Sequence, residues 1–244
     1  MSGTILYVLL VIFVATLIRS LFGFGEALIA VPLLALRLPV TIAAPLAVLV
    51  SITVAVVIVL QDWRHVQLRS ATWLVIASVA GIPFGLWLLA EGNQRLVKAL
   101  LGALIMGFAA FSLARRPPHL LAENRTWLLG CGFLAGILGG AYGMNGPPLA
   151  IYGAMRRWPA HHFRATLQGY FLPASVIGMA GYWIAGLWVA QVTHLYLLSL
   201  PATLAAILVG RSLHGRMQGN TFLRYVNAAL LITGAVLLVE AVSG

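Results

Sequence analysis

Charged residues are scarce in this chain. Asp and Glu together number 5 among 244 residues, and all charged residues make up 8% of the sequence. Soluble domains carry about 25% charged residues, so the composition excludes a soluble fold. Hydrophobic residues make up 61%, and apolar runs long enough to span a bilayer recur along the chain. The sequence therefore predicts a polytopic integral membrane protein with no separate soluble domain.

Cysteine is also scarce, since Cys131 is the only one. One cysteine excludes an intramolecular disulfide framework. The His, Cys and carboxylate residues show no metal-ligand spacing, so we predict no metal site. No Ser/His/Asp constellation and no nucleotide-binding loop is visible in the sequence. These absences argue against a membrane-embedded enzyme and against a bound cofactor.

The chain has a formal net charge of +10, which in a soluble protein would suggest nucleic acid as a partner. Most arginines, however, lie in short loops between apolar runs, where the positive-inside rule explains them. We therefore predict the lipid bilayer, and no nucleic acid, as the partner. The first ten residues, MSGTILYVLL, lack the charged region and cleavage site of a signal peptide and are predicted to begin the first span.

The stretch 136–157 reads GILGGAYGMNGPPLAIYGAMRR and contains an interrupted apolar run. Glycines, Asn145 and the pair Pro147 and Pro148 separate two apolar segments, and proline fits best in the first turn of a helix. We predict two half-helices that meet head to head inside the membrane. Non-helical backbone at that depth is tolerated only where it is buried in protein or lines a cavity. This break is therefore the predicted substrate site.

A similar interruption occurs near the start of the chain. The apolar run from Thr4 to Phe22 is broken at 23–26 and then resumes as far as Leu38. Shifting the sequence by 120 residues places this break on the later one. The order of breaks, polar closing residues and spans then coincides, which indicates two repeats, a common plan among transporters.

The predicted fold is an all-α polytopic membrane protein with two repeats. Each repeat has a broken or hairpin first helix with a glycine-rich break, followed by three transmembrane helices. The predicted bounds are 1–115 for the first repeat, 116–125 for the connecting loop and 126–244 for the second repeat. Together they form one integral membrane domain.

The loop charges bear on whether the repeats are parallel or inverted. If each broken segment crosses the membrane once, the loop arginines and lysines divide into about nine and five. If each is a hairpin, they divide into eleven and three, which favours hairpins, inverted repeats and both termini outside. The eleven predicted to face the cytoplasm are Arg64, Arg69, Arg115, Arg116, Arg125, Arg156, Arg157, Arg164, Arg211, Arg216 and Arg224, and the three outside are Arg37, Arg95 and Lys98.

The glycine pattern of the later break, Gly136-x3-Gly140-x2-Gly143-x-Asn145-Gly146, resembles the repeat signature of the TauE/SafE family, often called sulfite exporters. The stretch 23–34 resembles its first copy, and 81–85, a predicted kink or tight packing site, resembles its third-span motif. The resemblance covers nearly the whole chain. It implies a secondary carrier for sulfur-containing anions such as sulfite, sulfonates or sulfoacetate.

Two features depart from the family pattern. Glu26 stands where the family more often has a small residue, and Asn145 with the following proline pair replaces a plain glycine run. Both departures bear on the substrate and not on the class of protein.

Asn145 is predicted to cap the second half-helix. The free N–H groups and the positive end of that helix would then bind an anion together with the backbone at Gly143 and Gly146. The alternative is that Asn145 only satisfies its own backbone. Arg164 and Gln168 lie four residues apart on one helix face. Arg164 is predicted to reach toward Asn145 and bind an oxyanion through its fork of donors, or else to be a cytoplasmic anchor.

Arg19 lies inside an apolar helix one turn before the first break, and an ionisable residue at that depth indicates function. Snorkelling of its side chain to the nearer surface is the alternative. Glu26 begins the next half-helix, where the helix dipole favours an acid. The other interpretation is that Glu26 pairs with Arg19 or carries a coupling proton. We predict that these two residues supply charge balance or coupling, and that Gly23 and Gly25 belong to the substrate site.

Together these features predict a secondary transporter in a bacterial inner membrane. It would move a small sulfur-containing anion by alternating access, with the anion bound at the breaks near the midplane. The alternatives are a carrier or pore for another small organic anion and a non-transporting accessory subunit. Proton coupling, the direction of transport and a homo-oligomeric state stay open at this point.

Overall fold

The fold is known from a computed structural model, which describes residues 2–62, 68–113, 125–156, 160–213 and 220–243. These residues form ten helices and no strand, so the all-α prediction is confirmed. The first five are α1 (Ser2–Phe22), α2 (Glu26–Ala35), α3 (Val40–Asp62), α4 (Leu68–Glu91) and α5 (Gln94–Leu113). The others are α6 (Arg125–Tyr142), α7 (Gly146–Met155), α8 (Ala160–Ile184), α9 (Ala190–Leu213) and α10 (Asn220–Ser243). Except for Arg125, the predicted connecting loop 116–125 lies outside the described residues.

Five of the helices are long and apolar enough to cross a membrane, namely α1, α3, α4, α5 and α9. Their outward faces carry large apolar side chains. On α4, for example, Phe84 is 60% exposed and Trp87 is 68% exposed. A soluble surface seldom presents so much apolar area, whereas a surface that meets lipid does. The chain is a multi-pass membrane protein.

The two broken segments form hairpins. α2 packs against α1, and α7 packs against α6, so in each pair the short helix returns beside the long one. The head-to-head arrangement of half-helices predicted from the sequence is wrong in this respect. α1 has 21 residues and α6 has 18, because the apolar runs before the breaks are of nearly spanning length. Only α2 and α7 have the length of half-helices.

The lengths of the short helices place both breaks at mid-depth. α2 and α7 have 10 residues each, which is about 15 Å at 1.5 Å per residue. α2 ends two residues before the exposed Arg37, and α7 ends directly before Arg156. If these arginines mark the membrane surfaces, each break lies about 15 Å below a surface, which is half of a hydrocarbon core of about 30 Å.

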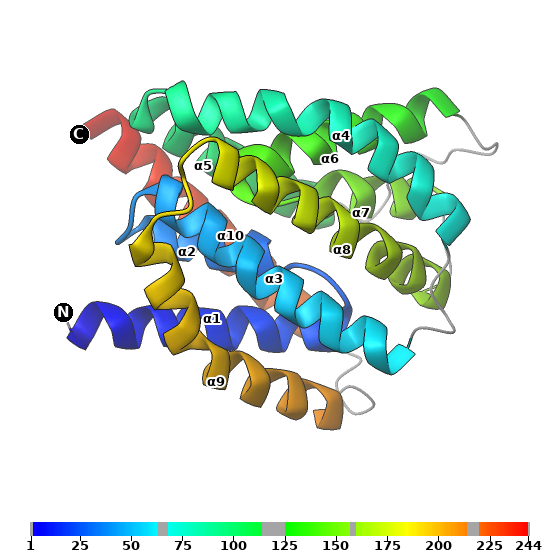
Figure 1. The fold of residues 1–244 in the computed structure, drawn as a ribbon, viewed down its shortest axis with the longest axis horizontal. Helices are drawn as coiled ribbons and strands as arrows, with labels where there is room; N and C mark the ends of the chain where they lie inside the picture. The colour runs from blue at the N-terminus through cyan, green and yellow to red at the C-terminus, as the bar shows by residue number, and fades with distance from the viewer. Residues whose placement is uncertain (1, 63–67, 114–124, 157–159, 214–219, 244) are drawn as a thin grey trace.

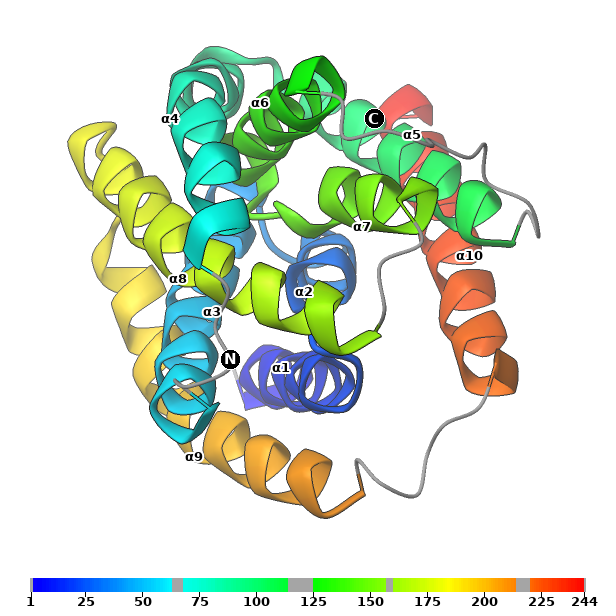
Figure 2. The ribbon, with the colours of Figure 1, turned by 90° about the vertical axis from the view of Figure 1, so that its right-hand side faces the viewer.

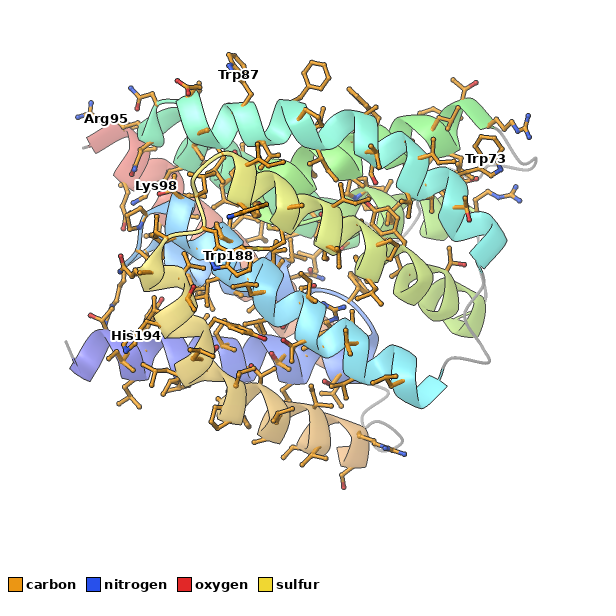
Figure 3. The ribbon with its side chains drawn as sticks, in the orientation of Figure 1. Trp73, Trp87, Arg95, Lys98, Trp188 and His194 are labelled. Carbon is orange, nitrogen blue, oxygen red and sulfur yellow. The ribbon has the colours of Figure 1, made fainter. Side chains whose placement is uncertain are left out.

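The chain directions distinguish the two halves. Both termini lie at the same end of the bundle; α1 and α3 run away from that end, and α6 and α8 run toward it (Figure 1). Arg95 and Lys98 lie at the end with the termini, and Trp73 lies at the opposite end (Figure 3). Arg125 stacks on Trp73 at 5.2 Å from the ring centroid. Whether the two halves are inverted repeats stays a prediction.

The short helices lie inside the bundle. Viewed along the bundle, α2 and α7 lie within a ring of longer helices (Figure 2). α3 and α8 pack against each other, α5 packs against α10, α4 packs against α6, and α9 packs against α1. The ring therefore encloses both breaks, as a membrane protein requires for backbone that is not helical.

Glycines bring the backbones of α4 and α6 together. A Cβ on Gly85 would lie 2.0 Å from the carbonyl oxygen of Ile137, and one on Gly136 would lie 2.2 Å from that of Ser78. The stretch 81–85 is thus a tight packing site, as predicted. Across the α9–α1 contact, a Cβ on Gly210 would lie 2.4 Å from the Cβ of Ser20. Small residues of this kind permit close approach of helices in membranes.

We expect Gly136→Ala to destabilise the protein, because the added methyl group meets the backbone of α4, which cannot move aside without shifting the helix. The cost should be roughly 1–3 kcal/mol, measured as a lower apparent Tm in detergent. Gly130→Ala is the matched control on the same helix, since nothing lies within 4 Å of the added Cβ there. Equal melting of Gly136→Ala and wild type would contradict the close approach.

Candidate functional site

The two breaks meet at one cavity in the interior of the bundle. Its volume open to the centres of water-sized molecules is about 20 Å³, more than the roughly 10–15 Å³ that one water needs. It is large enough to hold a water molecule. The lining comes from both breaks and from α1, α3 and α8: Arg19, Phe24, Gly25, Glu26, Ala27, Leu28, Ser51, Gly143, Met144, Asn145, Gly146, Pro147, Phe171 and Ser175.

Gly25 directs the start of α2 into this cavity. It is the N-cap residue and has φ 98°, a left-handed conformation that other residues rarely adopt. No side chain caps the helix. The first backbone N–H groups of a helix have no partner within the helix and carry the positive end of its dipole. At α2 these N–H groups belong to Glu26, Ala27 and Leu28, and these three residues line the cavity.

A buried ion pair joins the two sides of the first break. Arg19 Nη1 donates to Glu26 Oε2 at 2.6 Å, and the Thr16 hydroxyl donates to Glu26 Oε1 at 3.1 Å. Arg19 and Glu26 are each 2% exposed. Arg19 therefore does not snorkel to the surface, and Glu26 is more than a favourable charge at a helix end, because it binds a specific cation.

Part of the Arg19 guanidinium group is left for another partner. Its Nη1 also donates to the Ser51 hydroxyl, and its Cζ lies 5.1 Å from the centroid of the Phe171 ring. Nε and Nη2 are buried and have no hydrogen-bond partner among the described residues. Buried N–H groups without partners are costly and rare. These two N–H-bearing nitrogens belong to a residue that lines the cavity.

The second break ends α6 without a charged residue. The Gly143 N–H donates to the Gly139 carbonyl at 2.9 Å, and the Met144 N–H donates to the Leu138 carbonyl at 3.1 Å. Gly143 has φ 66°, as the residue after a helix end often does. The Tyr182 hydroxyl donates to the Gly139 carbonyl at 3.0 Å. These bonds satisfy the carbonyl end of α6 inside the bundle.

Asn145 does not cap α7, so that prediction is wrong. A capping side chain accepts a bond from the N–H of the second or third helical residue, and in α7 these are Pro147 and Pro148, which carry no N–H. Oδ1 of Asn145 is buried and has no hydrogen-bond partner in the described part of the chain. The residue lines the cavity and is 7% exposed. The atom without a partner is therefore a hydrogen-bond acceptor beside the cavity.

The two breaks differ in which of two corresponding positions carries the larger residue. A Cβ on Gly139 would lie 2.1 Å from Oδ1 of Asn145, so Asn145 fills the space beside Gly139. The 120-residue shift places Gly139 on Arg19 and Asn145 on Gly25. In the first half the larger residue is therefore Arg19, in the long helix α1. In the second half it is Asn145, directly before the short helix α7. Charge is confined to the first half of the site.

Of the predicted site residues, six line the cavity: Arg19, Gly25, Glu26, Gly143, Asn145 and Gly146. Gly23 is buried at the end of α1, where its N–H donates to the Arg19 carbonyl at 2.6 Å. The backbone of Arg164 and Gln168 belongs to α8, but their side chains lie outside the described part of the structure.

Sequence reasoning missed Ser51, Ser175 and Phe171. Ser51 lies between Val50 and Ile52 in α3, and Thr53 follows it. A hydroxyl group in a span was a general signal, because such groups often pair with other helices. The 120-residue shift places Ser51 on Phe171. Both line the cavity, and the linear sequence alone does not indicate this.

The arrangement suits a small anion. Arg19 offers charged donors, and the uncapped start of α2 offers backbone donors with the favourable sign of the helix dipole. Ser51 and Ser175 carry hydroxyl groups at the same cavity. Phe24, Met144 and Phe171 supply an apolar wall that keeps these groups away from bulk water. Among the described residues of this lining, none is a nucleophile paired with a base.

The sequence matches the family model described as Sulfite exporter TauE/SafE over residues 8–238. The match includes both breaks and nearly the whole chain. No curated protein and no solved structure matches the sequence.

We expect Arg19→Met to lower stability by about 3–5 kcal/mol, because it leaves the Glu26 carboxylate buried without its cation. The double variant Arg19→Met/Glu26→Leu should recover most of this loss, since two apolar residues can replace a buried ion pair at little cost. The apparent Tm in detergent reports both changes.

Lys98→Met is the matched control for this prediction. Lys98 pairs with Glu240 at 3.2 Å, but their side chains are 25% and 39% exposed, so its loss should cost only about 0–1 kcal/mol. A double variant that melts no higher than Arg19→Met would show that the two charges do not act as a pair.

Proposed function

The chain belongs to the TauE/SafE family of sulfite exporters, whose members are membrane transporters. From this premise we propose that it carries a small sulfur-containing anion, such as sulfite or a sulfonate, across a bacterial inner membrane by alternating access. The anion binds in the cavity between the two breaks, near the midplane. The protein acts as a secondary carrier and not as an enzyme.

The observation that carries this proposal is the buried guanidinium group of Arg19. A cation inside a membrane protein is expensive and usually functional. Here Nε and Nη2 are without partners in the described part of the chain, and the residue lines a cavity shared by both breaks. A guanidinium fork matches the geometry of an oxyanion such as sulfite or a sulfonate group.

The other polar groups of the cavity complete the site. The N–H groups at the start of α2 bind one oxygen of the anion, and the Ser51 and Ser175 hydroxyl groups bind others. Asn145 approaches from the opposite break and contributes its amide. Gly143 and Gly146 keep the backbone of the second break close to the anion because they carry no side chain. Specificity for an anion then comes mainly from the first half, which holds the charge.

Arg164 and Gln168 belong to the route by which the anion enters. With Phe171 and Ser175 they occupy positions i, i+4, i+7 and i+11 of α8, which lie on one helix face. Phe171 and Ser175 line the cavity, and Arg164 lies seven residues earlier, about 10 Å nearer the start of the helix. We place Arg164 at the mouth of the route, where its charge attracts anions.

Inverted repeats supply the alternating access. α4 packs against α6 as α9 packs against α1, and the two long helices of each pair belong to different halves. When the two halves exchange their conformations, the cavity opens first to one side of the membrane and then to the other. The opposite directions of α1 and α6 (Figure 1) support this arrangement. The termini then lie outside, on the side with fewer loop cations.

The proposal is tested by flux in proteoliposomes with sulfite, methanesulfonate, small carboxylates and cations. We expect saturable flux of sulfur-containing anions. Asn145→Ala and Arg164→Ala should each reduce kcat/KM by about tenfold, the value of one lost charge-assisted or buried polar contact.

Asn227→Ala and Arg211→Ala are the matched controls for these two variants. Asn227 is partly exposed on α10 and Arg211 is exposed near the end of α9, and neither residue lines the cavity. Their flux should therefore equal that of wild type.

Three results would reject this function. Flux that does not saturate and shows no counterflow indicates a pore. Flux of carboxylates in preference to sulfur-containing anions indicates a different substrate. No flux of any solute through folded protein indicates an accessory subunit.

A further inference from the structure

Arg19 holds Glu26 and offers donors to a ligand at the same time. Arg19 and Glu26 are each 2% exposed, and Arg19 Nη1 contacts Glu26 Oε2 at 2.6 Å. An anion that binds Nε and Nη2 would lie beside the Glu26 carboxylate, because both acids would share one guanidinium group. The inference that follows rests on the proposed function, since it requires that an anion binds here.

The charges at the cavity are few enough to count. Among the side chains that the structure describes around it, Arg19 and Glu26 are the only ionisable ones; α3, α8 and the second break contribute Ser51, Phe171, Ser175 and Asn145. Thr16 on α1 is the other group bonded to Glu26. The backbone of Arg164 lies about 10 Å along α8 from that of Phe171, toward the helix start, and the proposed function assigns its charge to the mouth of the route.

Four states of the site follow from these two charges. With no anion and a charged Glu26, the site is neutral. A monovalent anion makes it −1, and a proton on Glu26 without an anion makes it +1. Anion and proton together make it neutral again. A net charge at the centre of a bilayer is costly, so only the two neutral states reorient readily.

We propose that Glu26 takes up one proton when Arg19 binds a monovalent anion, so that the anion and the proton cross the membrane together. The proton comes from water on the side where the anion enters and forms an O–H bond at Oε2. The hydrogen bond from Arg19 Nη1 to Oε2 breaks, and the guanidinium group turns to the anion. Thr16 continues to hold Oε1. On the other side the proton returns to water, the anion leaves, and Arg19 pairs again with the carboxylate.

This scheme determines the class of substrate and the electrical behaviour. Monovalent anions are carried, and divalent anions are disfavoured because they leave a net negative charge. The transport cycle moves no net charge across the membrane. The empty site with a charged Glu26 is neutral and can reorient to face the first side again. The empty site with a protonated Glu26 carries a net charge and does not reorient, so the protein does not leak protons.

The first test uses wild-type protein in proteoliposomes with methanesulfonate, a permanent monoanion, and sulfite. An entrapped pH dye should report one proton entering with each methanesulfonate, and a potassium diffusion potential should not change the rate. Flux of anion without protons, driven by the membrane potential, would overturn the inference while leaving the proposed carrier function intact. No saturable anion flux at all would remove the proposed function itself.

The second test compares Glu26→Gln with Glu240→Gln. Glutamine keeps an acceptor for Arg19 but binds no proton, so the loaded site stays neutral and the empty site becomes +1. Glu26→Gln should therefore exchange anion for anion at a rate near that of wild type, whereas its net flux should fall by about tenfold or more. Glu240 belongs to the partly exposed pair with Lys98, and its variant should keep both activities.

The comparison also holds for sulfite. Sulfite binds protons itself, but the number of protons that it carries is the same for both variants. Equal net flux in Glu26→Gln and Glu240→Gln would overturn the inference. If Glu26→Gln does not fold, Glu26→Asp is used instead. This variant keeps a carboxylic acid, so it should retain flux that is coupled to protons. Flux of Glu26→Asp without protons would also overturn the inference.

Discussion

The first backbone groups of α2 and α7 lie in the interior of the bundle, away from bulk water, and the rest of the bundle encloses them. An unbonded backbone group in hydrocarbon costs several kcal/mol. The ring of long helices around the two short ones excludes lipid from both breaks (Figure 2). Tyr182 bonds the carbonyl end of α6, whereas the N–H end of α2 meets a cavity. The same constraint that requires enclosure therefore leaves the start of α2 at the cavity where we propose that the anion binds.

The two halves divide the chemistry of this site unequally. The first half carries the charged pair Arg19 and Glu26, and the corresponding positions of the second half are Gly139 and Gly146. Asn145 uses the space that Gly139 leaves. A site with charge in both halves would have to bury two ion pairs, and each costs desolvation energy. With one pair, the net charge of the cavity depends only on whether a ligand and a proton are present.

Particular residues show how far the sequence alone reaches. The positions of the two breaks follow from glycine, proline and the apolar runs, so they were predictable. The Arg19–Glu26 contact was one of two readings left open, because a seven-residue separation across a break does not fix a distance. The Asn145 cap was wrong for a reason visible in the sequence, since both candidate donors are prolines. Ser51, Ser175 and Phe171 were missed because they come from helices distant in the chain.

The sequence by itself determined that the chain is a multi-pass helical membrane protein with two interrupted segments, because apolar run length, glycine and proline act locally. Its motifs also indicated the family. Tertiary structure alone decided that the two breaks share one cavity, that Arg19 is buried against Glu26 instead of reaching the surface, and that α3 and α8 supply hydroxyl and aromatic groups to it. These are long-range outcomes of helix packing. They depend on glycines such as Gly85 and Gly136 that set how closely helices approach, and no local pattern records which helices those glycines will meet.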